Sequence, residues 1–335
     1  MLVFTTGISG CDEKEYLKQF RDFSAERGKR VKIYDIGEMM FEHASRIGIL
    51  ITKKNVLNTN PHILNSLRGA VIEKILANLE EDKKKYDVTV LGMHAMFFWK
   101  KIFIRAFDQY SLDRINPDMF LTFIDNSVKI KKRLDEREQW KDQKLEENEI
   151  MLWQNVEVEM TGVFAQMQKK PFFVLPIGHD SEILYKLIFH PNMEPVYISM
   201  PMTHQASATD KERVTKFAKE LNKYYTVFDP RTIEISARED EDRTVYYQTI
   251  NRDLYWLIRQ SKKVIGFFPS IILSTGVINE LREGYETNKE VWLIFPSNHR
   301  SPFTDYFTTK IFENERQFFD FVKKDLKAKY NVPIN

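Results

Sequence analysis

The sequence contains almost no cysteine. Cys11 is the single cysteine among 335 residues, so no disulfide can form within the chain and a reducing compartment is expected. No run approaches the roughly 18 apolar residues of a membrane-spanning helix. The first residues, MLVFTTGISG, also lack the basic and apolar segments of a secretory signal. These absences predict a cytoplasmic protein without a membrane partner.

An excess of charge of either sign is also missing. Lys and Arg number 50 and Asp and Glu number 48, which gives a formal net charge of +2. Proteins that bind nucleic-acid duplexes usually carry a strongly basic domain, so this balance argues against such a partner. The hydrophobic content of 43% is that of a globular protein, and a chain of this length is expected to form two domains.

Two catalytic signatures are absent from the sequence. The seven histidines are scattered and show no H-x-x-x-H or Cys/His spacing, so neither a metal site nor another cofactor is expected. No G-x-S-x-G motif occurs, which argues against a Ser-His-Asp hydrolase with a nucleophile elbow. Both absences direct attention to carboxylates and hydroxyls.

What the sequence does have is a repeated alternation of strand-like and helix-like segments. Short apolar runs such as MLVFTTG and YDVTVLG are separated by segments of helical spacing, a pattern typical of a parallel sheet with crossover helices. Pro191 and Pro195 interrupt this alternation, and it then begins again. We therefore predict an α/β protein of two three-layer, parallel-sheet domains, spanning residues 1–190 and 195–335.

The first domain begins with a strand, the loop TGISGCDEKE and a helix, which invites comparison with the phosphate-binding pattern G-x-x-x-x-G-K-[ST]. When the pattern is aligned from Gly7, Asp12 replaces the second glycine, Glu13 the lysine and Lys14 the hydroxyl residue. Two acidic side chains would then repel a triphosphate. A degenerate phosphate loop would comprise Gly7, Ser9, Gly10 and Lys14.

The first 185 residues weakly resemble P-loop nucleotide kinases, in this loop and in the strand DMFLTFID followed by KKRLDERE. The resemblance implies a P-loop-kinase-like fold for this domain. Three interpretations stay open: a degenerate domain kept for structure, dimerisation or regulation, a domain that binds another ligand, or ATP chemistry with Lys14 in place of the missing amine.

In the second domain, polar residues follow the predicted strands. Ligands bind beyond the carboxyl ends of the strands in open α/β sheets. The strand VYIS delivers Tyr197 and Ser199, the helix NRDLYWL carries Asp253, and the segment SIILSTGVINE ends in Glu280. One helix-plus-strand unit separates the two carboxylates, so both can reach one crevice. The apolar residues 271–273 are expected to dry that crevice and strengthen its charges.

Each of these residues also has a simpler explanation. Glu280 could be an acid of the first helical turn, favoured by the helix dipole, and Ser274 could cap the same helix. Asp253 could be a solvated helix residue, and Tyr197 could belong to the core. The order in which these residues occur together favours a site.

That order is the basis of a second resemblance. The run YISMPM…NRDLYWLIRQSKKVIGFFP…STGVINELREGYETNKEVWLIF, in residues 195–297, resembles the nucleoside 2-deoxyribosyltransferase superfamily. It is most similar to the branch of 2'-deoxynucleoside 5'-monophosphate N-glycosidases. Members show a tyrosine in the first strand, an aspartate in a helix before a buried strand, and an S/D-x-G-x-x-x-E element. The resemblance implies a flavodoxin- or Rossmann-like fold and a homodimer that completes its sites across the interface.

The resemblance also implies roles for individual residues. Glu280 would be the nucleophile at the anomeric carbon, Asp253 the acid/base or sugar-binding carboxylate, and Tyr197 the phenol that orients the nucleophile. Ser274 matches a serine of phosphate-using members and favours a 5'-phosphate substrate. The residues expected to bind substrate are Ser199, Ser274, Thr275, Gly276 and Asn279.

The segment after the first strand of this domain departs from the family pattern. The family often has glycine and small or basic residues there, where this chain has SMPMTHQAS. Thr203 and His204, together with Ser199, could supply the missing contacts. Candidate phosphate partners in the loop after the second strand are Arg231, Arg238 and Arg243.

The functional hypothesis is an enzyme that cleaves or transfers the N-glycosidic bond of a (deoxy)nucleoside 5'-monophosphate. Cleavage of this bond develops oxocarbenium character at C1', which a carboxylate can stabilise or capture. The first alternative is a nucleotide-binding sensor or scaffold without turnover, which the altered phosphate loop favours. The second alternative is an NAD-cleaving glycohydrolase, which would need the same glutamate chemistry.

Overall fold

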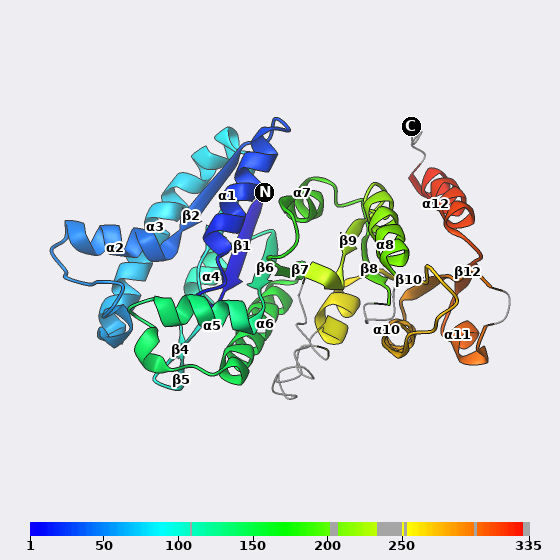
Figure 1. The fold of residues 1–335 in the computed structure, drawn as a ribbon. Helices are drawn as coiled ribbons and strands as arrows, with labels where there is room; N and C mark the ends of the chain where they lie inside the picture. Colours follow the sequence, from blue (N-terminus) through cyan, green and yellow to red (C-terminus); the bar gives the residue numbers. More distant parts are fainter. Residues whose placement is uncertain (108, 202–206, 233–249, 251–252, 298–299, 331–335) are drawn as a thin grey trace. The chain divides into compact units, whose positions relative to one another are not determined.

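The computed structural model of the chain describes residues 1–107, 109–201, 207–232, 250, 253–297 and 300–330. These residues form two compact units, one containing the described residues up to Glu182 and the other those from Ile183 onward (Figure 1). Each unit contains a five-stranded sheet in which every strand pair is parallel. The predicted class, α/β with two parallel-sheet units, is confirmed.

The sheet of the first unit has the strand order β2-β3-β1-β6-β7. Its strands are β1 (Leu2–Gly7), β2 (Val31–Asp35), β3 (Val88–Gly92), β6 (Met119–Ile124) and β7 (Phe172–Pro176). Its helices are α1 (Glu13–Ala25), α2 (Ile36–Arg46), α3 (Pro61–Lys85), α4 (Gln109–Ile115), α5 (Ser127–Glu136) and α6 (Glu147–Gln168). The smaller elements are the hairpin strands β4 (Met96–Trp99) and β5 (Ile102–Arg105) and the 3-10 turns η1 (Val56–Asn58) and η2 (Lys141–Gln143).

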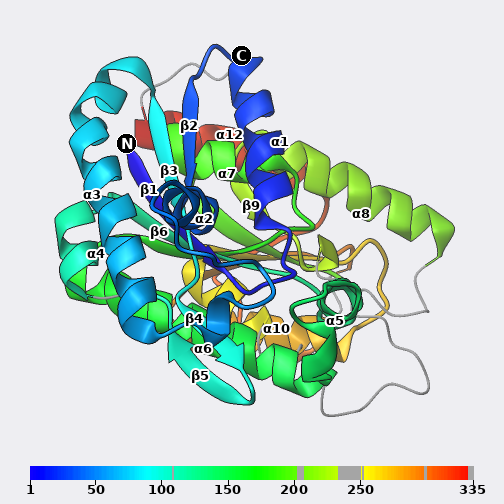
Figure 2. The same cartoon turned by 90° about the vertical axis from the view of Figure 1, so that its left-hand side faces the viewer.

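The sequence of the first unit explains this arrangement. All six residues of β1 are buried, as expected for a parallel strand that is covered on both faces. In α1 the buried residues Tyr16, Leu17, Phe20 and Ser24 follow the helical period, so one face of this helix packs inward. Figure 2 shows the sheet between α1 on one face and α3 on the other. Because β1 is parallel to its neighbours β3 and β6, the loop that follows it lies at the carboxyl edge of the sheet.

The sheet of the second unit has the strand order β12-β11-β10-β8-β9. Its strands are β8 (Pro195–Ser199), β9 (Thr226–Phe228), β10 (Lys263–Phe267), β11 (Glu290–Ile294) and β12 (Lys310–Phe312). The helices are α7 (Ser181–Phe189), which leads into this unit, α8 (Ala208–Leu221), α10 (Thr275–Glu286), α11 (Pro302–Tyr306) and α12 (Glu315–Tyr330). The shorter helical segments are η3 (Pro230–Thr232) and the π-helical turn η4 (Asp253–Ile258).

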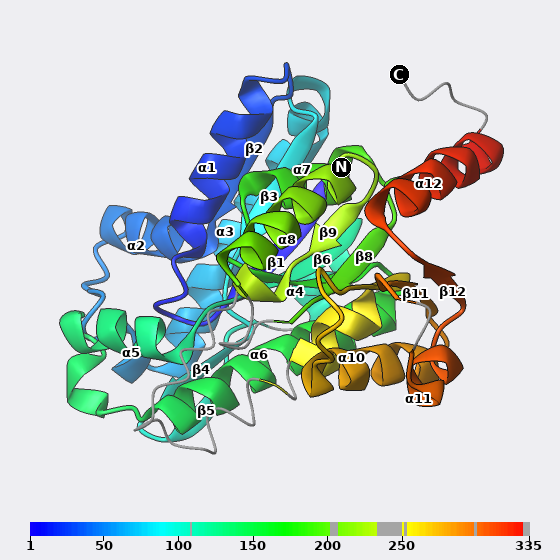
Figure 3. The same ribbon diagram turned by 45° about the vertical axis from the view of Figure 1, so that its right-hand side comes forward.

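Strand β8 sends alternate side chains to the two faces of this sheet. Val196 and Ile198 of β8, and Met200 directly after it, belong to the core cluster that also contains residues of α8 and α12. Because successive residues of a strand point to opposite faces, Tyr197 and Ser199 point to the other face. That face is covered by α10, which Figure 3 shows on the opposite side of the strands from α8. The hydroxyls of β8 are thereby directed at α10.

Two kinds of feature are absent from the part of the chain that the structure describes. None of its helices is both long and apolar enough to cross a membrane. No group of three or more His, Cys, Asp or Glu side chains comes together among the described residues in a way that could hold a metal ion.

Candidate active site

Glu280 lies between two hydroxyl groups at the carboxyl end of β8. The Tyr197 hydroxyl donates a hydrogen bond of 2.8 Å to Oε1 of Glu280, and the Ser199 hydroxyl donates one to Oε2. Tyr197 and Ser199 are fully buried, whereas Glu280 keeps part of its surface exposed. Both oxygens of the carboxylate are therefore held by hydroxyls of β8, while part of the Glu280 side chain stays exposed.

Two glycines bring α10 close enough to the sheet for these bonds to form. Gly266 of β10 is paired in register with Ser199, and a Cβ at this position would lie 2.9 Å from Cδ2 of Leu281 in α10. A Cβ at Gly284 of α10 would lie 2.6 Å from Cγ2 of Val264 in β10. Since neither glycine has a side chain, helix and sheet approach closely. Neither glycine could be recognised from the sequence, because a single glycine in a helix or strand does not reveal what it faces.

The surroundings of Glu280 change its acid–base behaviour. Burial raises the pKa of Glu280 to about 7, and the hydrogen bonds from Ser199 and Tyr197 act against this rise. At neutral pH the carboxyl group is therefore present in both protonation states. Such a group can attack as a carboxylate or exchange a proton with a ligand near physiological pH.

The raised pKa of Glu280 makes folding stability depend on pH. The folded state retains a proton that the unfolded state releases above pH 4.5, so this contribution to stability is complete below pH 4.5 and is lost as the pH rises to about 7. The free energy of unfolding of the wild type relative to Glu280→Gln should therefore fall by up to about 3 kcal/mol across this window. Urea titrations of both proteins at several pH values measure this difference.

The control for the stability prediction is Glu286→Gln, which changes an exposed carboxylate of the same helix that pairs with Arg282. It distinguishes the effect of the Glu280 environment from a general effect of lost charge on α10. A wild-type-to-Glu280→Gln difference that stays constant between pH 4.5 and 7 would contradict the prediction.

The simpler explanations of Glu280 and Ser274 do not fit the structure. Helix α10 begins at Thr275, so Glu280 lies beyond its first turn. Ser274 is the N-cap residue, but its side chain makes no capping hydrogen bond. The Ser274 hydroxyl thus forms no hydrogen bond with the first N–H groups of α10. The N–H groups at a helix N-terminus attract anions. The predicted binding residues Thr275, Gly276 and Asn279 are exposed around this helix start.

One expectation about the crevice is wrong. Ile271, Ile272 and Leu273 were expected to exclude water from it, but they are 67%, 48% and 50% exposed, respectively. Their place in a surface loop leaves them without the packing that would cover the carboxylate. The burial of Glu280 comes instead from the contact between α10 and the sheet.

Several predicted site residues cannot be placed beside Glu280. Asp253 begins the π-helical turn η4, but its side chain lies outside the described part of the structure. The predicted residues Thr203, His204, Arg238 and Arg243 also lie outside the described residues. Arg231 is described, and its guanidinium forms an ion pair with Asp229 at 2.6 Å. A role for Asp253 as partner of Glu280 therefore stays a prediction.

In the first unit, a carboxylate lies where the phosphate-loop comparison places an amine. The Thr5 hydroxyl donates a hydrogen bond to Oε1 of Glu13. A Cβ at Gly7 or Gly92 would lie 3.4 or 3.1 Å, respectively, from an oxygen of this carboxylate. Burial raises the pKa of Glu13 to about 7. The Glu13 carboxylate thus lies beside the ends of β1 and β3, at the edge of the sheet where a phosphate-binding loop would hold its phosphate.

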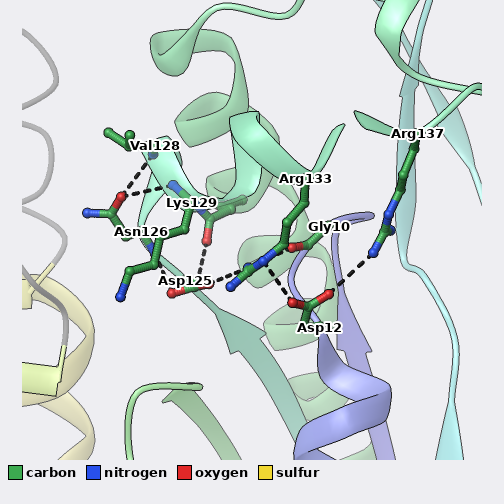
Figure 4. A network of polar contacts seen from close by, with 9 residues as sticks. Gly10, Asp12, Asp125, Asn126, Val128, Lys129, Arg133 and Arg137 are labelled. Carbon is green, nitrogen blue, oxygen red and sulfur yellow. Dashed lines mark hydrogen bonds and ion pairs between the residues drawn. The ribbon is translucent and has the colours of Figure 1, made fainter. Parts of the chain in front are cut away.

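The rest of this loop is held by ion pairs (Figure 4). Arg133 of α5 contacts Asp12 at 2.7 Å and Asp125, and it donates to the Gly10 carbonyl at 2.9 Å, while Arg137 contacts Asp12 at 3.3 Å. Gly10 has a φ of +87°, which a glycine adopts easily.

The remaining candidates in the loop are Lys14 and Ser9. The Lys14 ammonium is bound by Asp35 and Glu38 at 2.7 and 2.8 Å. These bonds disfavour Lys14 as a substitute for the missing amine. Ser9 lies in the turn between β1 and α1, and Gly7 is the last residue of β1.

Comparison with known proteins gives little further information. No family model and no curated protein matches the chain. A solved structure of a 2-deoxyribosyltransferase from Bacillus psychrosaccharolyticus is similar, with a TM-score of 0.32 and 19% identity, over 38% of this chain and 95% of that chain. This likeness is too remote to carry an argument about activity. The resemblance of the first 185 residues to P-loop kinases is not supported by the comparisons and stays a prediction.

Proposed function

We propose that the second unit is an N-glycosidase or deoxyribosyltransferase that acts on (deoxy)nucleoside 5'-monophosphates, with Glu280 as the nucleophile. The observation that carries this proposal is the Glu280 carboxylate, held by Tyr197 and Ser199 at the carboxyl edge of a parallel sheet and still partly exposed. Ligands of open α/β sheets bind at this edge. A second support is the order of Tyr197, Asp253 and Glu280 in the sequence, which resembles that of enzymes of this class.

The proposed reaction proceeds in two steps at C1' of the sugar. In the first, a Glu280 oxygen forms a bond to C1' as the C1'–N bond breaks, and the departing base receives the electron pair and takes a proton from Asp253. In the second, water or another base forms a bond to C1', its proton returns to Asp253, and the bond to Glu280 breaks. The Tyr197 hydroxyl steadies the carboxylate through both steps.

The proposed site for the 5'-phosphate is the beginning of α10. Ser274 makes no capping bond there, and no acidic residue occupies the first turn of this helix. The N–H groups of the first turn and the positive end of the helix dipole favour a phosphate. A hydroxyl at position 274 can donate to the phosphate, whereas a carboxylate would repel it.

This assignment predicts the effect of Ser274→Asp. The variant should lower kcat/KM for a deoxynucleoside monophosphate about 10- to 100-fold, because one lost charge-assisted hydrogen bond and one new repulsion are worth about 1.5–3 kcal/mol. The value for the corresponding nucleoside without phosphate should change little. Parallel assays with both substrates measure this, and equal losses for the two would contradict phosphate binding at Ser274.

The decisive experiment for the proposed function is an assay for free base. The purified chain is incubated with NAD or with each of the four deoxynucleoside monophosphates, with and without a second base as acceptor, and the products are separated by chromatography. Release of base, or formation of a new nucleotide, supports the proposal. Binding of nucleotides by calorimetry without any release would favour a sensor, and release of nicotinamide from NAD alone would favour a glycohydrolase.

A further inference from the structure

We propose that Ser199 is a positioning residue for Glu280, holding the nucleophilic carboxylate in place and in its ionised form through the bond to Oε2. This inference rests on the proposed function, because it assigns Ser199 to the machinery of that reaction. It differs from the expectation that Ser199 binds substrate. The side chain is fully buried and directed at Glu280, which leaves it no surface for a ligand.

The position of Ser199 in the fold accounts for this role. It is the last residue of β8, and its neighbour in β10 is Gly266, which has no side chain to fill the space between sheet and helix. A hydroxyl buried in such a place needs a hydrogen-bond partner. The partner is Oε2 of Glu280, so the bond ties the carboxylate of α10 to the end of β8.

Each of the two hydroxyls binds a different oxygen of the Glu280 carboxylate. Tyr197 donates to Oε1 and Ser199 to Oε2, so rotation of the carboxylate would break both bonds. A hydroxyl donates more strongly to an ionised than to a protonated carboxyl group. The Ser199 bond therefore lowers the pKa of Glu280 and opposes the larger effect of burial, which raises it to about 7. Without Ser199, less of the nucleophile would be ionised at neutral pH.

The other charged groups described on α10 and at the start of β10 have partners of their own. On α10, Arg282 pairs with Glu286, and Glu283 pairs with Arg259, which follows η4. Lys263, at the start of β10, forms ion pairs with Glu194 and Glu290. The titratable residue of β8 is Tyr197, which donates to Glu280 itself. The side chain of Asp253, at the start of η4, lies outside the described residues. The pKa of Glu280 is set by burial, which raises it, and by the hydrogen bonds from Ser199 and Tyr197, which lower it.

The test variant is Ser199→Ala. Loss of one hydrogen bond to a charged group should raise the midpoint of Glu280 titration by about one pH unit or more. The acidic limb of the pH profile of kcat/KM should move upward by the same amount, so the loss of activity is larger at pH 6 than at pH 9. The matched control is Ser261→Ala, which removes a buried hydroxyl of the same unit that donates to the Leu257 carbonyl.

The titration of Glu280 can be observed without turnover. Carbon NMR of protein labelled at the glutamate carboxyls, with Glu280 assigned through the Glu280→Gln variant, reports the midpoint directly. A raised midpoint in Ser199→Ala and an unchanged one in Ser261→Ala support the inference. An unchanged midpoint in Ser199→Ala overturns it even if the protein is active.

Failure of the proposed function gives a different result. If the wild type releases no base but Ser199→Ala still raises the midpoint, the proposed reaction fails while the hold of Ser199 on Glu280 stands. If Ser199→Ala does not fold, Ser199→Cys decides, since it nearly keeps the shape of the side chain but donates only a weak hydrogen bond. A raised midpoint in Ser199→Cys supports the inference, and a wild-type midpoint overturns it.

Discussion

Glu280→Gln is expected to lower kcat for base release by about a thousandfold or more, the loss typical of removing a covalent nucleophile. Glutamine has nearly the shape of glutamate and can still accept a hydrogen bond from Tyr197 or Ser199, so the fold should persist. Its amide, however, cannot form the bond to C1'. Rates measured with a deoxynucleoside monophosphate at high enzyme concentration give the ratio.

Two further measurements identify the role of Glu280. The intact mass of the wild type, taken during turnover, should show a population increased by one sugar phosphate, and Glu280→Gln should show none. In Glu280→Ala, added azide can enter the vacated space, and it should restore cleavage by attacking C1' itself. The control Glu286→Gln alters an exposed carboxylate of the same helix. If the rate of Glu280→Gln lies within tenfold of the wild-type rate, Glu280 is not the nucleophile.

Gly284→Ala is expected to lower the free energy of unfolding of the second unit by about 1–3 kcal/mol. The new Cβ would lie 2.6 Å from Cγ2 of Val264 and 3.2 Å from Cγ2 of Val291, so α10 would have to move away from the sheet. This strain opposes the gain in helix propensity of about 1 kcal/mol that alanine brings. Movement of α10 also withdraws Glu280 from Tyr197 and Ser199, so base release should fall together with stability. Urea unfolding measures the stability change.

Two controls separate crowding from helix propensity. Gly69 lies in α3, and nothing lies within 4 Å of the Cβ it would carry, so Gly69→Ala should stabilise its unit by about 0.5–1 kcal/mol. Combining Gly284→Ala with Val264→Ala should recover part of the loss of the two single changes, because the second change removes the atoms that clash. Wild-type stability in Gly284→Ala would show that α10 does not depend on this close contact.

The fold class was accessible from the sequence because both sheets are parallel and covered on both faces. Such strands are short apolar runs, as in β1 and β10, and the helices between them show their own period. The meeting of Tyr197 and Glu280 was also predicted, since strand ends and helix starts place polar groups at one edge of the sheet. The catalytic roles of both residues stay predictions. The domain limits, the homodimer and the cytoplasmic location stay predictions.

The sequence by itself determined the alternation of strands and helices and the order of Tyr197, Ser199 and Glu280 along the chain. Only the tertiary structure decided that the Ser199 hydroxyl turns to Glu280, that residues 271–273 are exposed, and that Lys14 is bound by two carboxylates. The physical reason is distance. Local patterns specify which face a residue takes, but partners far apart in the chain meet only when helix and sheet pack, and here two glycines without side chains set how closely they do so.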